Sequence, residues 1–89
     1  MHVESNAIWF TTSEDLAVWQ GFRQIFTPKE VETYQRLILE KRTAWQFINE
    51  MPVRVVSYDP TEHQVEVKML SKGRFYNTTW WIDNRDCRK

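Results

Sequence analysis

Few residues in this chain have the types and spacing that catalysis requires. His2 stands at the amino terminus and His63 in or beside a predicted turn, and neither has an obvious carboxylate or nucleophile to orient it. One cysteine, Cys87, and two distant histidines lack the paired spacing of a zinc site, and two glycines cannot build a phosphate-binding loop. The sequence therefore predicts a protein that is not an enzyme and holds no metal or other cofactor.

The strongest binding chemistry lies in residues 74–82, where aromatic side chains alternate with polar and basic ones. As a regular strand, this segment would place Phe75 and Trp81 on one face and Tyr76 and Trp80 on the other. Tryptophan, tyrosine and arginine dominate binding hot spots, because they remove much area from water at modest entropic cost. We therefore expect a partner-binding surface. Its candidate residues are Lys72, Arg74, Tyr76, Trp80 and Arg85.

Three arrangements could account for aromatic side chains on both faces of one strand. The N-terminal strand could fold over the sheet, or curvature of the sheet could enclose both sets of rings in the core. The exposed set could instead form a homodimer interface or bind a different protein. Bases of a single-stranded nucleic acid could also stack on Tyr76 and Trp80, beside Lys72 and Arg74.

The balance of charge favours a protein partner over nucleic acid. The 89 residues include 12 Lys or Arg and 12 Asp or Glu, so the molecule has no net field that would attract a polyanion. The basic residues late in the chain are also diluted by Asp83 and Asp86. We therefore expect another protein, or a second copy of this chain, ahead of nucleic acid.

The composition predicts one domain over residues 1–89, because 42% hydrophobic and 15% aromatic residues can bury a single core at this length. Residues 1–6 and 84–89 are expected to be mobile. The lone Cys87 indicates a reducing compartment, and its place near the carboxyl end indicates exposure. No secretory pattern and no segment of membrane-spanning length is present, so we expect a cytoplasmic protein without membrane contact.

A strand and a helix are predicted ahead of the aromatic segment. Residues 7–10 form a short apolar run rich in strand-forming types. Thr12 with Asp15, or Ser13 alone, can cap a helix that begins near Glu14. Apolar residues then recur at three- and four-residue steps, which is the pattern of a helix that packs one face on a core.

A second helix is predicted from the clearest local motif in the chain. Thr27 can cap the helix, Pro28 suits its first turn, and Glu30 completes a capping box. Apolar residues at helical spacing predict that the helix continues to about Asn49. Pro52 would then prevent any further extension.

Beyond that helix the apolar period changes to two. Residues 53–55 and 64–69 are predicted strands, and Asp59 followed by Pro60 suits the turn of an antiparallel hairpin. The predicted fold class is α+β, with a short N-terminal strand, two helices and a three-stranded antiparallel β-meander packed on the helices. Its predicted core consists of Trp19, Phe22, Tyr34, Ile38, Trp45, Val65 and Val67.

Together, these observations predict a non-enzymatic protein-binding module that docks through an aromatic and basic sheet surface. An adaptor or a phage-type inhibitor is the expected role, because small single domains without motifs are common among accessory and mobile-element proteins. The alternative is a single-stranded nucleic-acid-binding module that uses the sheet aromatics for stacking.

Overall fold

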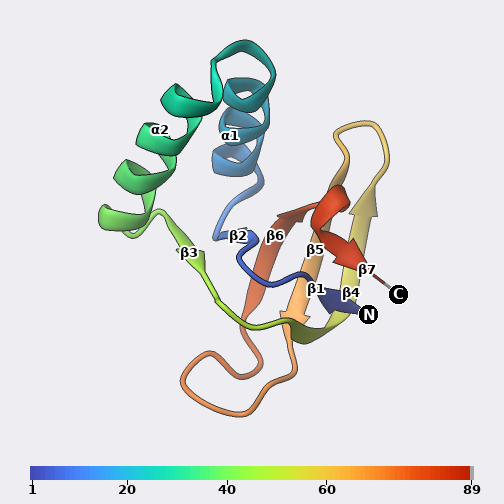
Figure 1. The fold of residues 1–89 in the computed structure, drawn as a ribbon. Helices are drawn as coiled ribbons and strands as arrows, with labels where there is room; N and C mark the ends of the chain where they lie inside the picture. Colours follow the sequence, from blue (N-terminus) through green and yellow to red (C-terminus); the bar gives the residue numbers. More distant parts are fainter. Residues whose placement is uncertain (89) are drawn as a thin grey trace.

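The computed structural model describes residues 1–88, and within them two helices and seven antiparallel strands form an α+β fold. Figure 1 shows the two helices as a hairpin that projects from one end of the sheet. In chain order the elements are β1 (His2–Val3), β2 (Ile8–Phe10), α1 (Ser13–Ile25), α2 (Pro28–Glu40), β3 (Ala44–Gln46), β4 (Met51–Asp59), β5 (Gln64–Met69), β6 (Thr79–Asp83), the 3₁₀ turn η1 (Asn84–Asp86) and β7 (Cys87–Arg88).

The α+β class is confirmed, but the sheet is larger than the predicted three-stranded meander. The described strands have the order β3-β2-β6-β5-β4-β1-β7, so the meander β4–β5–β6 is only the middle of the sheet. The hairpin expected at Asp59 and Pro60 is present between β4 and β5. Strands β1, β3 and β7 have two or three residues each, which is too short to produce a recognisable two-residue period.

The two ends of the chain are paired with each other, although we expected residues 1–6 and 84–89 to be mobile. His2 lies opposite Arg88 and Val3 opposite Cys87, and the Arg88 guanidinium also contacts the Glu4 carboxylate. The side chain of Val3 is fully buried. Lys89 lies outside the described residues.

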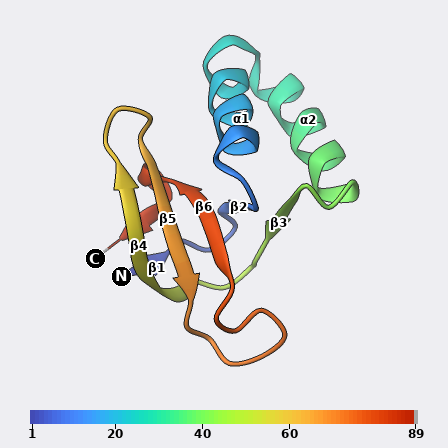
Figure 2. The ribbon, with the colours of Figure 1, turned by 180° about the vertical axis from the view of Figure 1, so that it is seen from behind.

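The buried residues form two clusters. The helices cover the smaller cluster, which lies against β2 and β3 and consists of Ile8, Phe10, Leu16, Trp19, Ile38 and Ala44. The larger cluster consists of Val3, Ala7, Trp9, Val53, Val65, Val67, Met69, Trp80 and Ile82. Figures 1 and 2 show β1 and β7 lying across the β4–β5–β6 meander, so the chain ends help to cover this second cluster.

The meander packs on the helices only in part, through β6 against α1, and the predicted core is divided between the two clusters. Val65 and Val67 are buried in the larger cluster, and Trp19 and Ile38 in the smaller one, so these four are confirmed as core residues. The other three predicted core residues are only half-buried; they are Phe22, Tyr34 and Trp45.

Both helices begin where local capping predicts. The Thr12 hydroxyl accepts a hydrogen bond from the Asp15 amide at 3.2 Å, at the start of α1. At the start of α2, the Glu30 amide donates to the Thr27 hydroxyl at 3.3 Å, and the Glu30 carboxylate accepts from the Thr27 amide at 3.1 Å. The capping box is therefore complete.

The predicted extension of the second helix to Asn49 is wrong, because α2 ends at Glu40. Arg42 has a φ of 60°, in the left-handed region that commonly terminates helices. The chain then enters β3, where Trp45 lies opposite Trp9 of β2. Pairing with β2 gives this segment strand contacts that it would lack as part of a longer helix. These tertiary contacts outweigh the helical spacing of its apolar residues.

Gly21 offers a test of the backbone of α1. It lies inside the helix, and a Cβ at this position would meet nothing within 4 Å. Gly21→Ala is expected to raise the free energy of unfolding by about 0.5–1 kcal/mol, because alanine loses less backbone entropy on folding. Gly73→Ala is the matched control and is expected to lower the free energy of unfolding, because Gly73 has a φ of 141°, which alanine adopts only with strain. Urea denaturation of both variants checks the pair, and destabilisation by Gly21→Ala would contradict the described helix.

Candidate partner-binding surface

Strand β3 and the loop between β5 and β6 bring basic and aromatic side chains together. The ring centroids of Trp45 and Phe75 are 5.1 Å apart, and both rings are half-buried. The guanidinium carbon of Arg42 lies 5.4 Å from the ring centroid of Trp45, and that of Arg74 lies 5.4 Å from that of Phe75. We call this region the Arg42/Arg74 surface, and it consists of Arg42, Trp45, Lys72, Arg74, Phe75 and Tyr76.

The loop of residues 70–78 is folded against the open end of the β4–β5 hairpin. Its base is closed by two backbone hydrogen bonds, from the Met69 amide to the Thr78 carbonyl at 2.9 Å and from the Asn77 amide to the Met69 carbonyl at 3.0 Å. The Trp80 indole N–H donates to the Thr78 hydroxyl at 2.7 Å. These contacts fix the loop and hold Phe75 beside β3.

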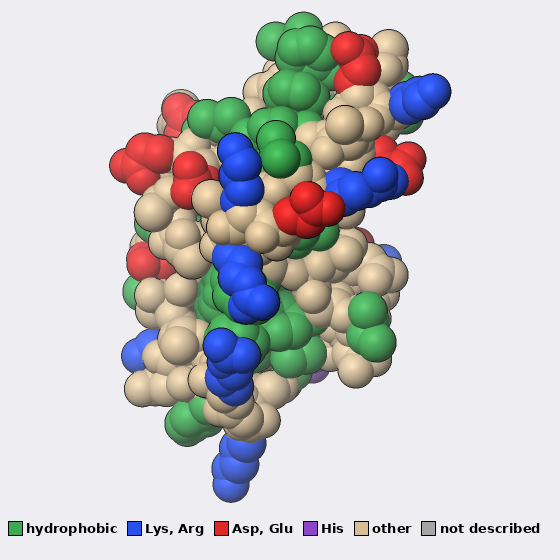
Figure 3. Space-filling model, turned by 90° about the vertical axis from the view of Figure 1, so that its left-hand side faces the viewer, with side chains coloured by type: hydrophobic (Ala, Val, Ile, Leu, Met, Phe, Trp, Pro, Cys, Tyr) green, Lys and Arg blue, Asp and Glu red, His purple; other side chains and the backbone are tan. Residues whose placement is uncertain are grey.

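The positive charge of this surface has no acidic partner within residues 1–88. Arg42, Lys72 and Arg74 are exposed, and none of them forms an ion pair in that range. Figure 3 views the side of α2 and β3 and shows Lys and Arg side chains in a column beside hydrophobic ones, with the acidic side chains mostly in the upper half. Aromatic rings attract guanidinium groups, so the two arginines present charge that is positioned but not neutralised by the described part of the chain.

Three of the predicted site residues lie together in this loop: Lys72, Arg74 and Tyr76, and the Tyr76 side chain is well exposed at 53%. Trp80 does not join them at the surface, because it is only 4% exposed and belongs to the larger cluster. The predicted strand over residues 74–82 is shorter in the structure, since β6 begins at Thr79. The expected alternation therefore does not reach the loop residues.

The two tryptophans of β6 show which of the three alternatives applies to this strand. Trp80 points into the cluster that β1 helps to cover, and Trp81 packs against the cluster under the helices. An enclosed sheet therefore accounts for Trp80, whereas Trp81 is enclosed only in part. Phe75 and Tyr76, which we expected on the strand, lie in the loop instead.

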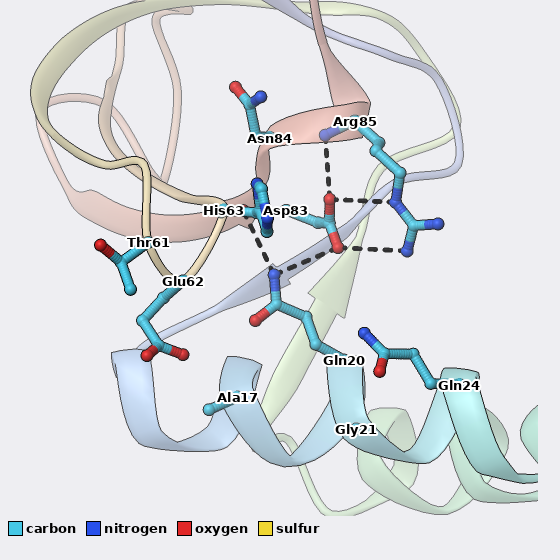
Figure 4. A pocket seen from close by; sticks show the side chains of 10 residues that line it. All are labelled: Ala17, Gln20, Gly21, Gln24, Thr61, Glu62, His63, Asp83, Asn84 and Arg85. Carbon is cyan, nitrogen blue, oxygen red and sulfur yellow. Dashed lines mark hydrogen bonds and ion pairs between the residues drawn. The ribbon is translucent and has the colours of Figure 1, made fainter.

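The fifth predicted residue, Arg85, lies at the opposite end of β6 and is not part of the Arg42/Arg74 surface. It lines a cavity of about 560 Å³ between α1, the β4–β5 turn and η1. Figure 4 shows its guanidinium directed at the Asp83 carboxylate. Both nitrogens of this contact, Nε and Nη2, lie 3.3 Å from Asp83 oxygens, and the Arg85 amide donates to Oδ1 at 2.9 Å.

Asp83 organises this end of the molecule. Its side chain is almost fully buried, and besides Arg85 it accepts a hydrogen bond from the Gln20 side-chain amide at 3.2 Å. Burial raises the pKa of Asp83, but the hydrogen bonds from Arg85 and Gln20 and the charge of Arg85 outweigh burial and hold the pKa below its usual value. The bond between Asp83 and Arg85 joins η1 to β6, so Arg85 has a structural role here.

Cys87 is partly buried, contrary to the expected exposure, and packs against the larger cluster. Burial, together with the charges of Asp86, Asp83 and Glu4, raises the pKa of the Cys87 thiol from 9.0 to about 12. The thiol therefore stays protonated at neutral pH, where the thiolate is the reactive form.

The thiol of Cys87 is consequently expected to react slowly with a disulfide reagent. At pH 8 the native protein should react about tenfold or more slowly than the urea-unfolded chain, because folding removes both access and thiolate. Absorbance of the released reagent thiolate measures both rates. Equal rates in the two states would contradict the described burial.

Sequence reasoning did not assign Arg42 and Trp45 to this surface. Both residues fall within the second helix predicted from the sequence, and Trp45 was assigned to the core. The pattern that could have found them is the basic pair Lys41 and Arg42 at a helix end, followed by a short strand-like segment.

Within residues 1–88, no group of three or more His, Cys, Asp or Glu side chains is arranged to hold a metal ion. No helix in the same range has the length and hydropathy needed to cross a bilayer. Compared with known proteins, the chain matches no family model, and no curated protein and no solved structure matches it at a significant level.

Proposed function

We propose that this protein is a non-enzymatic binding module, an adaptor or inhibitor, that docks an acidic patch of another protein through the Arg42/Arg74 surface. The observation that carries the proposal is the pair of guanidinium groups held over aromatic rings, without an ion pair to any acidic residue of the described chain. Arginine presents a planar fork of donors that matches a carboxylate, so a carboxylate-rich surface suits it.

The packing of the arginines supports binding at low entropic cost. A flexible arginine loses rotamer freedom when it binds, whereas Arg42 and Arg74 already rest on Trp45 and Phe75. The half-buried rings also supply apolar contact area around the two arginines. Binding hot spots need such area around their charged groups. The surface thus combines two positioned positive charges with half-buried aromatic rings that partly exclude water from them.

Single-stranded nucleic acid is the second candidate, and one observation favours it. The Tyr76 ring is exposed in the same loop as Lys72 and Arg74, so a base could stack on it while the cations contact phosphate. Against this, the rings of Trp45 and Phe75 already carry an arginine each, which leaves them less available to bases. A protein partner therefore fits the surface better.

A titration with two polyanions separates the candidates. A glutamate-rich peptide and an oligo(dT) of equal charge are added to the protein, and tryptophan fluorescence is followed at low and at physiological salt. At physiological salt we expect the peptide to bind more tightly than oligo(dT), because contacts that are mainly to phosphate weaken steeply with salt. Tighter binding of oligo(dT) at both salt concentrations would favour the nucleic-acid candidate.

Matched variants locate the contact. The double variant Arg42→Gln with Arg74→Gln is expected to weaken peptide binding about fivefold or more, because it removes two charge-assisted contacts. Arg54→Gln is the control, because Arg54 is another exposed arginine, on β4, without an ion pair within residues 1–88. Equal losses in the control and in the double variant would contradict the proposed surface.

A further inference from the structure

The tip of the helical hairpin exposes an apolar surface that the proposed function does not use. We call it the hairpin surface, and its apolar residues are Phe22, Ile25, Phe26, Tyr34 and Leu37. Ile25 is 79% exposed, Phe26 and Leu37 are exposed as well, and Phe22 and Tyr34 are half-buried. Isolated exposed apolar residues are common, but a contiguous group of this kind marks an interaction site.

The hairpin surface is exposed because the helices extend past the sheet. Trp19 packs on the core at the base of the hairpin, and its ring stacks on Tyr34 with centroids 6.2 Å apart. The stack continues outward through Phe22, 4.3 Å from Tyr34, to Phe26, 4.0 Å from Phe22. Figures 1 and 2 show this end of the hairpin projecting away from every strand, so nothing in the described chain covers it.

A groove runs along the hairpin surface and has a mixed-charge rim. Its volume is about 420 Å³, and Phe22, Tyr34 and Leu37 line it together with Lys29 and Glu30. The last two carry opposite charges and are adjacent in the first turn of α2. The rim is therefore neutral overall.

The charge pattern fits a second copy of this chain as the occupant. A two-fold interface brings one patch against the same patch of its partner, so the patch must be complementary to itself. The hairpin surface meets this condition, because Lys29 of one protomer can lie against the Glu30 carboxylate of the other, whose hydrogen bonds to Thr27 both use Oε1 and leave Oε2 for this contact. The Arg42/Arg74 surface does not meet it, because like charges would face each other.

We infer that the protein forms a two-fold symmetric homodimer through the hairpin surface. The projecting hairpins meet at their tips, and the groove of each protomer receives apolar side chains of the other. This interface leaves the Arg42/Arg74 surface of both copies free, so the dimer presents two docking surfaces. The inference does not depend on the proposed function, because it uses different residues.

Sedimentation equilibrium of the full chain tests the inference. At about 100 µM the wild-type protein is expected to show twice the monomer mass of 10.9 kDa. Ile25→Lys should give the monomer mass, because it places an unpaired charge in the interface. Ile48→Lys is the matched control: Ile48 is 77% exposed but lies after β3, outside the hairpin, so this variant should stay dimeric.

A second variant separates dissociation from loss of fold. Lys29→Glu should weaken the dimer about tenfold, because the introduced carboxylate of one copy would face the Glu30 carboxylate of the other. The same change should not destabilise the monomer, since an acidic residue in the first helical turn suits the helix dipole. Circular dichroism checks that each variant is folded. A monomeric wild type, a dimeric Ile25→Lys variant, or dissociation by Ile48→Lys would each overturn the inference.

Discussion

Replacing Trp80 with alanine is expected to lower the free energy of unfolding by about 3–5 kcal/mol. The ring is 4% exposed and makes edge contacts with Trp9 and Phe75, at centroid distances of 6.0 and 5.7 Å. It also contacts Trp45 and Phe47, and its N–H bonds to a loop hydroxyl. Truncation would therefore leave a cavity in the larger cluster and release the β5–β6 loop. Small domains have about 5–15 kcal/mol of stability, so this is a large fraction.

Urea denaturation followed by circular dichroism measures this effect. Tyr76→Ala is the control, because Tyr76 lies four residues earlier in the exposed loop and its loss should cost about 0.5 kcal/mol or less. From residue type alone, both side chains were expected to be surface aromatics. Similar effects of the two substitutions, or a loss below about 1 kcal/mol for Trp80→Ala, would contradict the described core.

Asp83→Asn is expected to lower the free energy of unfolding at neutral pH by about 2–3 kcal/mol. The carboxylate is 3% exposed and accepts hydrogen bonds from Gln20 and Arg85. An amide has one acceptor oxygen and no charge, so the variant leaves buried donors without a full set of acceptors. Asp59→Asn is the control, because Asp59 accepts two backbone hydrogen bonds in the exposed β4–β5 turn. It should cost clearly less.

The dependence of the free energy of unfolding on acid pH is a second test of the role of Asp83. The pKa of Asp83 is held below its usual value of 3.8 in the folded protein. The unfolded chain therefore takes up the proton first as the pH falls. The stabilisation is fully present above pH 3.8 and is lost as the pH falls below that value through the folded pKa. This part of the acid dependence should be missing in Asp83→Asn, and an unchanged profile would contradict the Asp83 network.

The sequence predicted those parts of the fold that depend on local chemistry. The start of α2 follows from Thr27 and Glu30, whose capping bonds span three residues. The β4–β5 hairpin follows from two-residue alternation around Asp59 and Pro60. The end of α2 was missed, because β3 is stabilised by pairing with β2, and that pairing joins residues far apart in sequence.

The candidate site was predicted in part for the same reason. Lys72, Arg74 and Tyr76 were identified by residue type, and all three belong to the loop between β5 and β6. Trp80 was assigned to the surface by its residue type, because the sequence did not show what covers its face of the sheet. The chain ends helped to cover that face, and their strands of two residues carry no pattern that sequence could show. Arg42 joins the site only through the fold of β3.

The central claim is that the Arg42/Arg74 surface captures acidic side chains of a partner protein. The most direct test is a titration of the isotope-labelled protein with a glutamate-rich peptide, followed by amide and indole chemical shifts. We expect the largest shifts at residues 42–46 and 72–76, including the Trp45 indole, and their loss in the Arg42→Gln, Arg74→Gln double variant. Shifts that are largest around Arg54, or spread evenly over all exposed basic residues, would contradict the claim.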